Sequence, residues 1–436
     1  MNTRKLVLGT ILLLAGLLAN LNPQPLLAAG TNYYVDSVAG SDNNSGTSNA
    51  SPWKTLTQVM SRHYSPGDTV NFKRGSSWTG LLLIQDAGTQ SNPITFRDYG
   101  SGARPTISNP TTGAGKYVIH VQASWVVVQG FLVKDSGDSG IEVANGANHN
   151  IIQDNEATNT GAGVTVCGQF NLITNNYAHD LHMIVNTLIP TNDDYGAFGF
   201  LIANSDNEVS YNRCVNCRAS SYDYGTDGGV IEIYANGDNS YIHHNYGEAS
   251  NGFLEVGGGS AQSVRVAYNV SNNNGDFACL HNGGTFASTI NNFRIENNTI
   301  TNTTETGSLL IPCMDAPLAN AGQLLFRNNI VQSVEAVFNQ TTFTHSNNIF
   351  YMLSGATVGF SLVSTERVTN PLFAQGMPCP FHIQSSSPAV AAGMNLGYTV
   401  DYHNNPVPSA PAIGSHEYVS MAPSGSPVIY LPILHR

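Results

Sequence analysis

Four acidic residues lie close together in a chain with few charges. Only 11% of the residues are charged, yet Asp223, Asp227, Glu232 and Glu255 follow one another in one short region. Glu232 stands in VIEIY and Glu255 in FLEVG, so each glutamate has apolar residues on both sides. A pair of carboxyl groups, one protonated and one charged, cleaves most glycosidic bonds. We therefore take Glu232, Glu255 and Asp227 as candidate catalytic residues.

The apolar residues around the two glutamates predict how they point. Side chains alternate between the two faces of a strand, so an apolar residue on each side of a glutamate directs that glutamate to the outer face. If the two strands are adjacent and in register, their backbones lie about 4.8 Å apart. Like charges at that spacing repel each other unless a shared proton, an arginine, a calcium ion or a catalytic role offsets them.

Two long segments before these strands carry the candidate substrate-binding residues. Tyrosine rings stack on the apolar face of a sugar, carboxylates accept its hydroxyl protons, and long insertions in a repetitive fold often form its binding face. A column of Asp227, Glu232, Glu255, Asp276 and His281 would form the floor of the site. The candidate substrate-binding residues are Tyr195, Tyr222, Tyr224, Asp194, Asp223, Asp276, His281 and Arg218. No cofactor is required by this chemistry, although Asp193, Asp194 and Asp223 offer oxygen ligands to calcium.

The elements that must position these residues come from a repeat. Short alternating runs such as NIIQDNEA, SYIHHNYG and FRIENNTI each end at an asparagine. The alternation predicts strands, and asparagine suits the corner because it tolerates the left-handed conformation. Stacked asparagines also form hydrogen-bonded ladders. The expected corner positions are Gly130, Asn155, Asn176, Asn212, Asn245, Asn269, Asn298, Asn329 and Asn348.

Strands that recur every 20 to 35 residues or so indicate a solenoid whose coils cover one another. We predict an all-β fold, a single-stranded right-handed parallel β-helix solenoid with an N-terminal capping helix. The helix is expected in SPWKTLTQVMSRH, with Ser51 as N-cap and Pro52 as the first helical residue. Its apolar stripe would consist of Leu56, Val59 and Met60.

The two ends of this region resemble a known group. YYVDSVAGSDNNSGT and PGDTVNFKRGSSWTG near the start, and NPLFAQ and SSSPAVAAG near the end, are similar to right-handed parallel β-helix proteins of the pectate-lyase-like superfamily. The closing segment departs from the usual pattern at Val407 and Ala412. The resemblance, over about 33–418, is specific for the fold and weak for the activity. It implies that the protein is carbohydrate-active, since most exported members act on polysaccharides.

The chain divides into three parts. Residues 1–29 combine a basic start, a short apolar run and small residues, which predicts a secretory signal peptide. Residues 30–418 would form the β-helix domain, and 419–436 a linker with a short C-terminal tail. We expect a secreted or cell-surface-associated monomer without a transmembrane segment, because no other apolar run reaches membrane length.

Charge and spacing argue against several other classes. The net charge of −12 excludes the basic surface that nucleic-acid binding needs. The Cys214-x-x-Cys217 pair has no second pair at zinc-finger spacing, so it is weak grounds for a metal site. Adjacent residues of a strand point to opposite faces, so His243 and His244 are not expected to bind one metal ion, and His244 is expected to pack between coils.

Three functions compete. The favoured one is a secreted glycoside hydrolase acting on a polysaccharide or oligosaccharide, retaining if the carboxyl groups are about 5 Å apart and inverting at about 6.5–9.5 Å. A calcium-assisted polysaccharide lyase is second, because no lysine follows Lys134 to act as base, although Arg213, Arg218 or Arg265 could do so. A non-catalytic surface glycan-binding β-helix is third, because it would not concentrate its acidic residues in one region.

Overall fold

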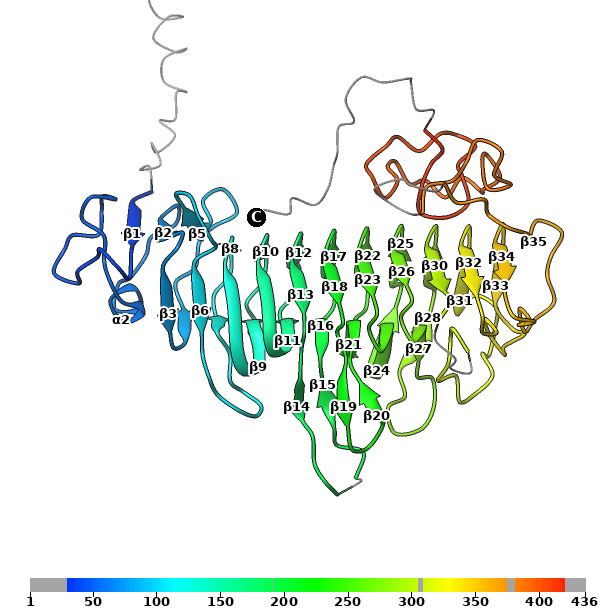
Figure 1. Cartoon of the computed structure of the whole chain (residues 1–436), viewed down its shortest axis with the longest axis horizontal. Coiled ribbons are helices and arrows are strands. Elements are labelled where there is room, and N and C mark those ends of the chain that lie inside the picture. The colour runs from blue at the N-terminus through cyan, green and yellow to red at the C-terminus, as the bar shows by residue number, and fades with distance from the viewer. Residues whose placement is uncertain (1–29, 190, 305–308, 375–380, 420–436) are drawn as a thin grey trace, which may run out of the picture.

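The computed structural model describes residues 30–189, 191–304, 309–374 and 381–419. Within them the chain winds into a long stack of coils whose strands pair in parallel with the same strand of the next coil (Figure 1). The predicted parallel β-helix is therefore confirmed. The predicted signal peptide at 1–29 and nearly all of the tail lie outside the described residues, as does Cys379.

One face of the stack is a single parallel sheet of twelve strands. Its first pair, β1 and β2, matches Val35 with Phe72, and each later coil adds one strand in the same direction. In order, the strands are β1 Asn32–Val35, β2 Thr69–Lys73, β5 Ile94–Tyr99, β8 Val126–Gln129, β10 Ile151–Gln153, β12 Leu172–Thr174, β17 Glu208–Ser210, β22 Tyr241–His243, β25 Arg265–Ala267, β29 Phe293–Glu296, β31 Leu324–Arg327 and β33 Thr344–Ser346.

The other faces follow after the corner of each coil. The strands directly after the corner are β3 Ser77–Thr79, β6 Thr106–Ser108, β9 Leu132–Val143, β11 Glu156–Val166, β13 Tyr177–His179, β18 Arg213–Val215, β23 Tyr246–Glu248, β26 Val270–Asn272, β30 Thr299–Asn302, β32 Ile330–Ser333, β34 Ile349–Met352 and β35 Arg367–Val368. The last face holds β4 Leu82–Ile84, β7 Ile119–Val121, β16 Phe198–Ile202, β21 Gly229–Asn236, β24 Gly252–Gln262, β27 Asp276–Leu280 and β28 Thr289–Asn291, together with the second halves of β9 and β11.

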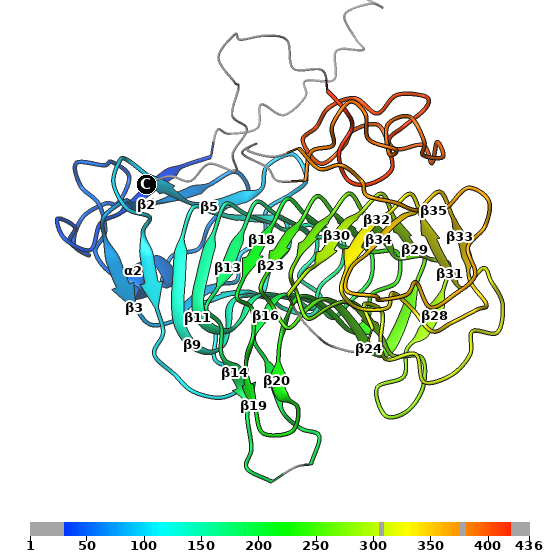
Figure 2. The same cartoon turned by 45° about the vertical axis from the view of Figure 1, so that its right-hand side comes forward.

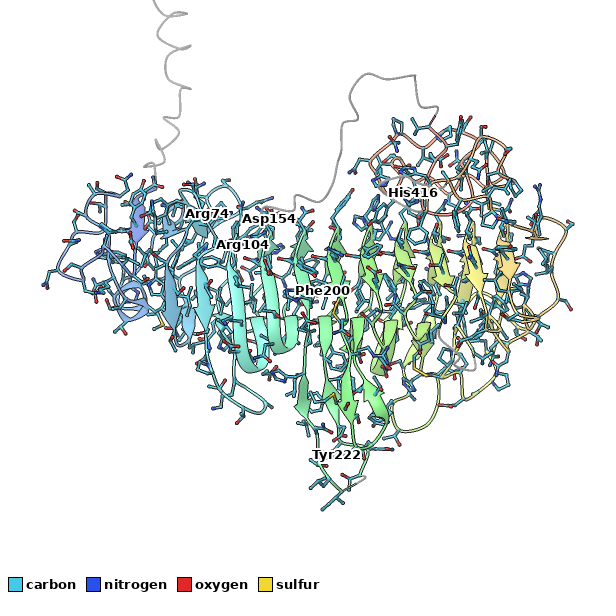
Figure 3. All side chains as sticks on the ribbon, in the orientation of Figure 1. Arg74, Arg104, Asp154, Phe200, Tyr222 and His416 are labelled. Atoms are coloured by element: carbon cyan, nitrogen blue, oxygen red, sulfur yellow. A yellow bond between two sulfur atoms is a disulfide. The ribbon has the colours of Figure 1, made fainter. Side chains whose placement is uncertain are left out.

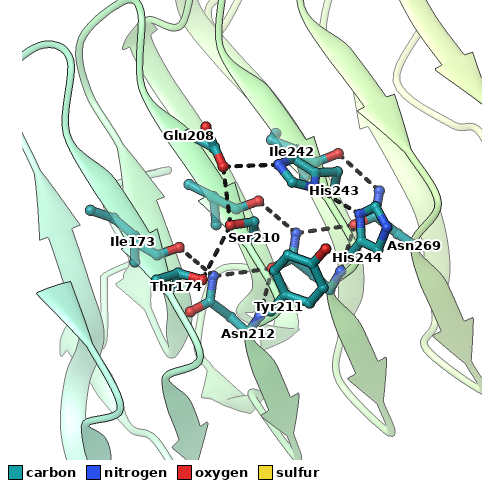
Figure 4. A network of polar contacts seen from close by, with 12 residues as sticks. Ile173, Thr174, Glu208, Ser210, Tyr211, Asn212, Ile242, His243, His244 and Asn269 are labelled. Atoms are coloured by element: carbon teal, nitrogen blue, oxygen red, sulfur yellow. Dashed lines mark hydrogen bonds and ion pairs between the residues drawn. The ribbon is translucent and has the colours of Figure 1, made fainter. Parts of the chain in front are cut away.

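The predicted asparagine ladder is confirmed. From Asn155 to Asn329, each corner asparagine donates its side-chain N–H to the side-chain oxygen of the corner asparagine in the next coil, at 3.0–3.2 Å, and Asn348 is the last acceptor. The second N–H reaches a backbone carbonyl, as from Asn212 to Ile173 at 2.8 Å (Figure 4). The ladder thus satisfies buried backbone groups at a corner where no strand pairing is available.

The prediction that the corner asparagine itself takes the left-handed conformation is wrong. The left-handed residue is the one before each corner asparagine, for example Tyr211 at φ 56° and His244 at φ 58°. Gly130, at φ 84°, is equivalent to those residues and not to an asparagine. Phe131 takes the asparagine position, since its N–H donates to the side-chain oxygen of Asn155 at 3.1 Å. Asparagine is needed because its side-chain amide both donates and accepts hydrogen bonds, and not because of its backbone freedom.

The N-terminal capping helix is not confirmed. The expected segment contains only α2, Leu56–Met60, which is a little more than one turn. Thr55, not Ser51, caps it by accepting the N–H of Gln58 at 3.1 Å. The mouth of the stack is closed largely by aromatic rings, with Tyr33 stacked on Trp53 at 5.0 Å. No helix among the described residues is long and apolar enough to cross a membrane.

The coils end at β35, and residues 369–374 and 381–419, the C-terminal segment, fold back over the outside of the stack (Figures 1 and 2). The described part of this C-terminal segment contains isolated bridges but no strand of the stack. Ile383, Ala412 and Ile413 pack in an apolar cluster with Ile330 and Ile349 of the coils. The end of the predicted domain is therefore a loop-rich cover rather than further solenoid.

Two hairpins project from the opposite side of the stack (Figure 2). The first joins β14 Met183–Val185 to β15 Tyr195–Gly196, and the second joins β19 Ala219–Ser221 to β20 Gly225–Asp227. They are the two long segments predicted from the sequence, and they stand next to the strands that carry Glu232 and Glu255.

Candidate active site

Glu232 and Glu255 lie side by side, as the sequence predicts. They are Cα partners on the neighbouring parallel strands β21 and β24. The residues before and after Glu232, Ile231 and Ile233, are buried in the core, so the alternation of the strand directs the glutamate away from it. Parallel strands in register stand about 4.8 Å apart, so the structure holds this carboxyl pair at close range.

The two glutamates have different surroundings. Glu232 is 6% exposed, and burial raises its pKa well above the ordinary value, with the charges of Glu255 and Asp227 adding to the effect. Burial therefore favours the protonated form of Glu232. The Glu255 side chain is 36% exposed, and its Oε1 lies 3.1 Å from Nε2 of His281. One member of the pair is thus a buried acid, and the other is open to solvent and to a hydrogen-bond donor.

Asp227 is a third carboxyl group in the same electrostatic field. It ends β20 at the base of the second hairpin and is buried. Burial raises the pKa of Asp227 to about 7; the Gly228 N–H at 2.7 Å opposes this, and the charges of Glu255 and Asp194 add to it. Asp227 therefore titrates near neutral pH, where it can act as acid or base.

The predicted column is wrong at Asp276. The Cα partner of Glu255 in the next coil is Cys279, which forms a disulfide with Cys313. Asp276 pairs instead with Gly252, and its Oδ1 is buried without a hydrogen-bond partner among the described residues. Burial, with the charges of Glu255 and Glu335, raises the pKa of Asp276 well above its ordinary value. Asp276 therefore contributes to the electrostatic field of the site and does not line the floor beside Glu255.

Toward the N-terminus the same outward row continues through a second acidic group. Leu201, Thr165 and Glu142 are the successive Cα partners that lead away from Glu232. His120, the next in the row, places Nε2 2.6 Å from Oε2 of Glu142. The sequence reasoning missed His120, although its alternating context VIHVQ matches that of Glu142 in GIEVA.

The hairpins are joined by a cluster of aspartates. Asp194 is buried and accepts hydrogen bonds from the Thr187 N–H at 2.6 Å, the Ser221 hydroxyl at 2.7 Å and the Asp223 N–H at 2.9 Å. Asp223 in turn accepts from the N–H groups of Asp193 and Asp194. Burial acts to raise the pKa of Asp194, but these hydrogen bonds outweigh it and lower the pKa. Asp194 and Asp223 thus fasten the hairpins together.

The same three aspartates are those predicted to bind calcium. Asp193, Asp194 and Asp223 each place a carboxylate oxygen within 4.8 Å of the others. Oxygen ligands at such spacing suit calcium. The cluster therefore fits the predicted cation site by its donor set, while its hydrogen bonds also account for it without an ion.

The predicted sugar-contacting tyrosines divide into two groups. Tyr222 and Tyr224 on the second hairpin are 59% and 43% exposed, and Figure 3 labels Tyr222 among the projecting loops. Burial raises the pKa of Tyr224, with the charges of Asp223, Asp227 and Glu255 adding to it, so Tyr224 lies near the acids. Tyr195 is 40% exposed. Burial and the charge of Asp138 raise its pKa, so Tyr195 lies farther toward the N-terminus than Tyr224.

Arg218 is the last of the predicted substrate-binding residues. Arg218 is half-buried and directly precedes β19, next to the disulfide between Cys214 and Cys217. This disulfide replaces the metal site considered for those cysteines.

A cavity of about 350 Å³ lies on the C-terminal side of the glutamate pair. It is lined by Gly259, Asn282 and neighbouring residues, but not by the glutamates.

The prediction that the side chains of His243 and His244 point to opposite faces of the strand is wrong. Their Nδ1 atoms lie 2.7 Å from each other (Figure 4). His243 ends β22, but His244 turns left-handed, so the strand alternation no longer applies. Each ring has a further partner: Nε2 of His243 lies 3.1 Å from Glu208, and Nε2 of His244 lies 2.8 Å from the Asp401 carbonyl. His244 does pack between coils, stacked on Tyr211 at 4.6 Å.

No protein family model matches the chain. A lacto-N-biosidase of Bifidobacterium longum subsp. longum is 41% identical over 88 residues, which are 19% of this chain and only 6% of that protein. Pectate lyase Pel9A superposes with a TM-score of 0.59 at 16% identity, covering 89% of this chain and 97% of that one. The GH136 lacto-N-biosidase from Eubacterium ramulus gives 0.52 at 15% identity, covering 74% and 68%. XylC in complex with xylose gives 0.56 at 11% identity, covering 88% and 98%. These likenesses establish the pectate-lyase-like β-helix.

Proposed function

We propose that this protein is a carbohydrate-active enzyme that hydrolyses a glycosidic bond with Glu232 and Glu255. One observation carries the proposal: the two glutamates are in register on adjacent strands, and only one of them is buried. Two negative charges so placed would destabilise the sheet, and a proton held by one of the two glutamates removes this repulsion. A protonated and an ionised carboxyl group at close range are what hydrolysis of a glycoside requires.

The roles follow from the surroundings. Glu232, buried and protonated, donates its proton to the departing glycosidic oxygen. Glu255, open and beside His281, attacks the anomeric carbon and forms a glycosyl ester as the bond to the leaving oxygen breaks. Glu232, now a carboxylate, takes a proton from water, whose oxygen displaces Glu255 from the sugar. The close spacing of the strands favours this two-step, retaining course over inversion.

Asp227 supports a second course at the same site. Its pKa of about 7 suits a general acid at neutral pH. With Asp227 as acid and Glu255 as base for water, the enzyme would invert the anomeric configuration. The stereochemistry of the product separates the two courses.

The comparisons support a saccharide substrate. The lacto-N-biosidase that shares 41% identity over 88 residues and the lacto-N-biosidase with the same fold are both named for cleaving a glycoside. Exposed tyrosines on the hairpins give this chain rings on which a sugar can stack. We therefore infer an oligosaccharide or polysaccharide substrate, and an enzyme that is exported to reach it.

A calcium-assisted lyase is the second candidate, and the convergence of Asp193, Asp194 and Asp223 favours it. Two of the basic residues that it would need are engaged elsewhere. The Arg213 guanidinium lies 5.1 Å from the centre of the Tyr177 ring, and that of Arg265 lies 4.2 Å from the centre of the Tyr241 ring. Both belong to other faces of the stack, so the hydrolase is preferred.

A digest of a glycan panel tests the proposal. The protein is incubated with neutral and uronate-containing glycans, with and without EDTA, and both new reducing ends and the absorbance of unsaturated uronates are followed. Hydrolysis gives reducing ends without absorbance and is indifferent to EDTA. Absorbance that EDTA abolishes would establish the lyase instead. If neither signal appears on any glycan, while glycans still bind, the protein is a binding module.

A further inference from the structure

Three histidines meet in the C-terminal segment, far from the acidic pair. One ring nitrogen each of His382, His403 and His416 lies within 4.8 Å of the other two. Figure 3 places His416 at the lower edge of this segment, on the side of the stack away from Tyr222. The rings pack closely, with His382 and His403 stacked at 4.9 Å and His416 at 4.8 Å and 4.9 Å from them. Histidines that far apart in the chain do not converge through local structure.

The three rings are shielded from water. His416 is 1% exposed, and the other two are partly buried. A neutral imidazole carries one free lone pair, which is the form that binds a metal ion.

Among the described residues, one buried nitrogen of the cluster has no hydrogen-bond partner. Nε2 of His403 is buried and has no hydrogen-bond partner among the described residues. Such a group is costly and points to an ion or water that completes it. Nδ1 of His416, by contrast, lies 2.8 Å from the Ser415 hydroxyl. That hydroxyl contacts Thr299 of the coils at 2.8 Å, so the ring is anchored through a second layer, as metal-binding histidines are.

The backbone that carries the cluster is also fixed. The buried Asp401 accepts the N–H of His403 at 2.9 Å and that of Glu417 at 2.9 Å. The loops bearing His403 and His416 are therefore held together whether or not an ion is present. His382 comes from a third loop, next to the apolar Phe381 and Ile383.

We propose that His382, His403 and His416 bind one divalent transition-metal ion, zinc in particular, which holds three loops of the C-terminal segment together. Three imidazoles suit zinc, whereas calcium and magnesium prefer oxygen. Zinc–nitrogen bonds of about 2.0–2.1 Å in a tetrahedron bring the ligand nitrogens to about 3.3 Å from one another. The three ring nitrogens lie within 4.8 Å of one another, so binding an ion would draw them together by up to about 1.5 Å. The ion would close the gap between three loops in a segment that lacks regular strands.

Zinc binding by the full chain tests this proposal. The oxidised protein is stripped with EDTA, dialysed and titrated with zinc against a chromophoric chelator, and its metal content is measured by mass spectrometry. We expect one zinc per chain, a thermal midpoint that rises with zinc and not with magnesium, and X-ray absorption showing three imidazole nitrogens at about 2.0–2.1 Å. His382→Gln and His403→Gln should each weaken zinc binding at least tenfold.

Two control variants separate this site from others. His281→Gln alters the group formed by Cys279, His281 and Cys313, and Asp193→Asn alters the aspartate cluster, so both should bind zinc as the unchanged protein does. His382 is only partly buried, so His382→Gln should fold even if a change at His416 does not. A chain that takes up no zinc, or histidine variants that bind it undiminished, would overturn the proposal and leave the rings as packing residues.

Discussion

Nε2 of His281 lies 3.1 Å from Oε1 of Glu255, and the same nitrogen lies 3.2 Å from the sulfur of Cys279. His281 follows β27, the strand after the glutamate pair, and the disulfide of Cys279 with Cys313 fixes this point of the chain. The histidine thus reaches back to the more exposed carboxylate of the pair. It is placed to orient Glu255, while burial favours the protonated form of Glu232.

We expect His281→Ala to lower kcat about 10- to 100-fold, because a hydrogen bond to a charged group contributes about 1.5–3 kcal/mol. His120→Ala is the matched control: it breaks a histidine–glutamate contact of the same row, at Glu142, away from the pair. Equal effects of the two changes would show that His281 has only a structural role.

Replacement of the proposed nucleophile tests the retaining course. Glu255→Ala should lower kcat by at least about a thousandfold, the scale expected when a covalent step is lost. Added azide should restore turnover and yield a glycosyl azide of inverted configuration, because a small anion can fill the place of the carboxylate. Glu232→Ala should not give that product on its own. If azide rescues neither variant and the natural product is inverted, Asp227 and Glu255 form the working pair.

Asp227 should make the protein less stable as the pH rises. Its pKa is about 7 in the folded protein and ordinarily 3.8, so between these values the folded state holds a proton that the unfolded state has released. The free energy of unfolding therefore falls from pH 4 to pH 7, by up to about 4 kcal/mol for this group. Asp227→Asn, which keeps an oxygen for the Gly228 N–H, should be more stable than the unchanged protein at pH 8 and equal to it at pH 4. Urea unfolding at both values measures the difference, and a gap that is the same at pH 4 and pH 8 would contradict this assignment.

The sequence predicts the parts of this molecule that repeat. Alternation and the recurring asparagine determine the strands, the coil register and the pairing of Glu232 with Glu255, because each coil has the same neighbours. Asp276 was misplaced because the register pairs it with Gly252, three positions before Glu255. Such a local offset has no signature in composition or period.

Features that depend on non-repeating contacts could not be predicted. The aspartates of the hairpins were expected to face a sugar, but Asp194 has hydrogen bonds to both its oxygens. The meeting of His382, His403 and His416 depends on how three irregular loops pack on the coils. His120 could have been found, since it has apolar residues on both sides, as Glu232 and Glu255 have.

The junction at Asp194 should control substrate binding more than chemistry. Asp194→Ala removes the acceptor of three hydrogen bonds from Thr187, Ser221 and Asp223, so both hairpins should loosen. We expect KM to rise about tenfold with kcat within about threefold, because the tyrosines lose their positions while the glutamate strands stay paired. Hydrogen exchange at the Thr187 and Asp223 amides should quicken. Thr191→Ala, which removes exposed hydroxyl contacts to Asp193 and to the Ile189 carbonyl, is the control. A fall in kcat alone for Asp194→Ala would contradict this role.

The asparagine ladder should be the main local determinant of coil stability. Asn245 is fully buried; it donates to the Val209 carbonyl at 2.8 Å and to Asn269 at 3.0 Å, and it accepts from the N–H of Asn212 at 3.0 Å. Asn245→Ala leaves the Val209 carbonyl and the Asn212 N–H buried without partners. At about 1–3 kcal/mol for each of the two groups, the free energy of unfolding should fall by about 2–6 kcal/mol.

The matched control for this change is Asn239→Gly. Asn239 is exposed and left-handed at φ 61°, so glycine keeps its backbone conformation and removes only a surface hydrogen bond to Asp206. Its effect should stay within about 0.5 kcal/mol. Urea unfolding of both variants, followed by circular dichroism, measures the contrast. A loss at Asn245 no larger than that at Asn239 would mean that strand pairing alone holds the corner, because the buried amides would then have found other partners.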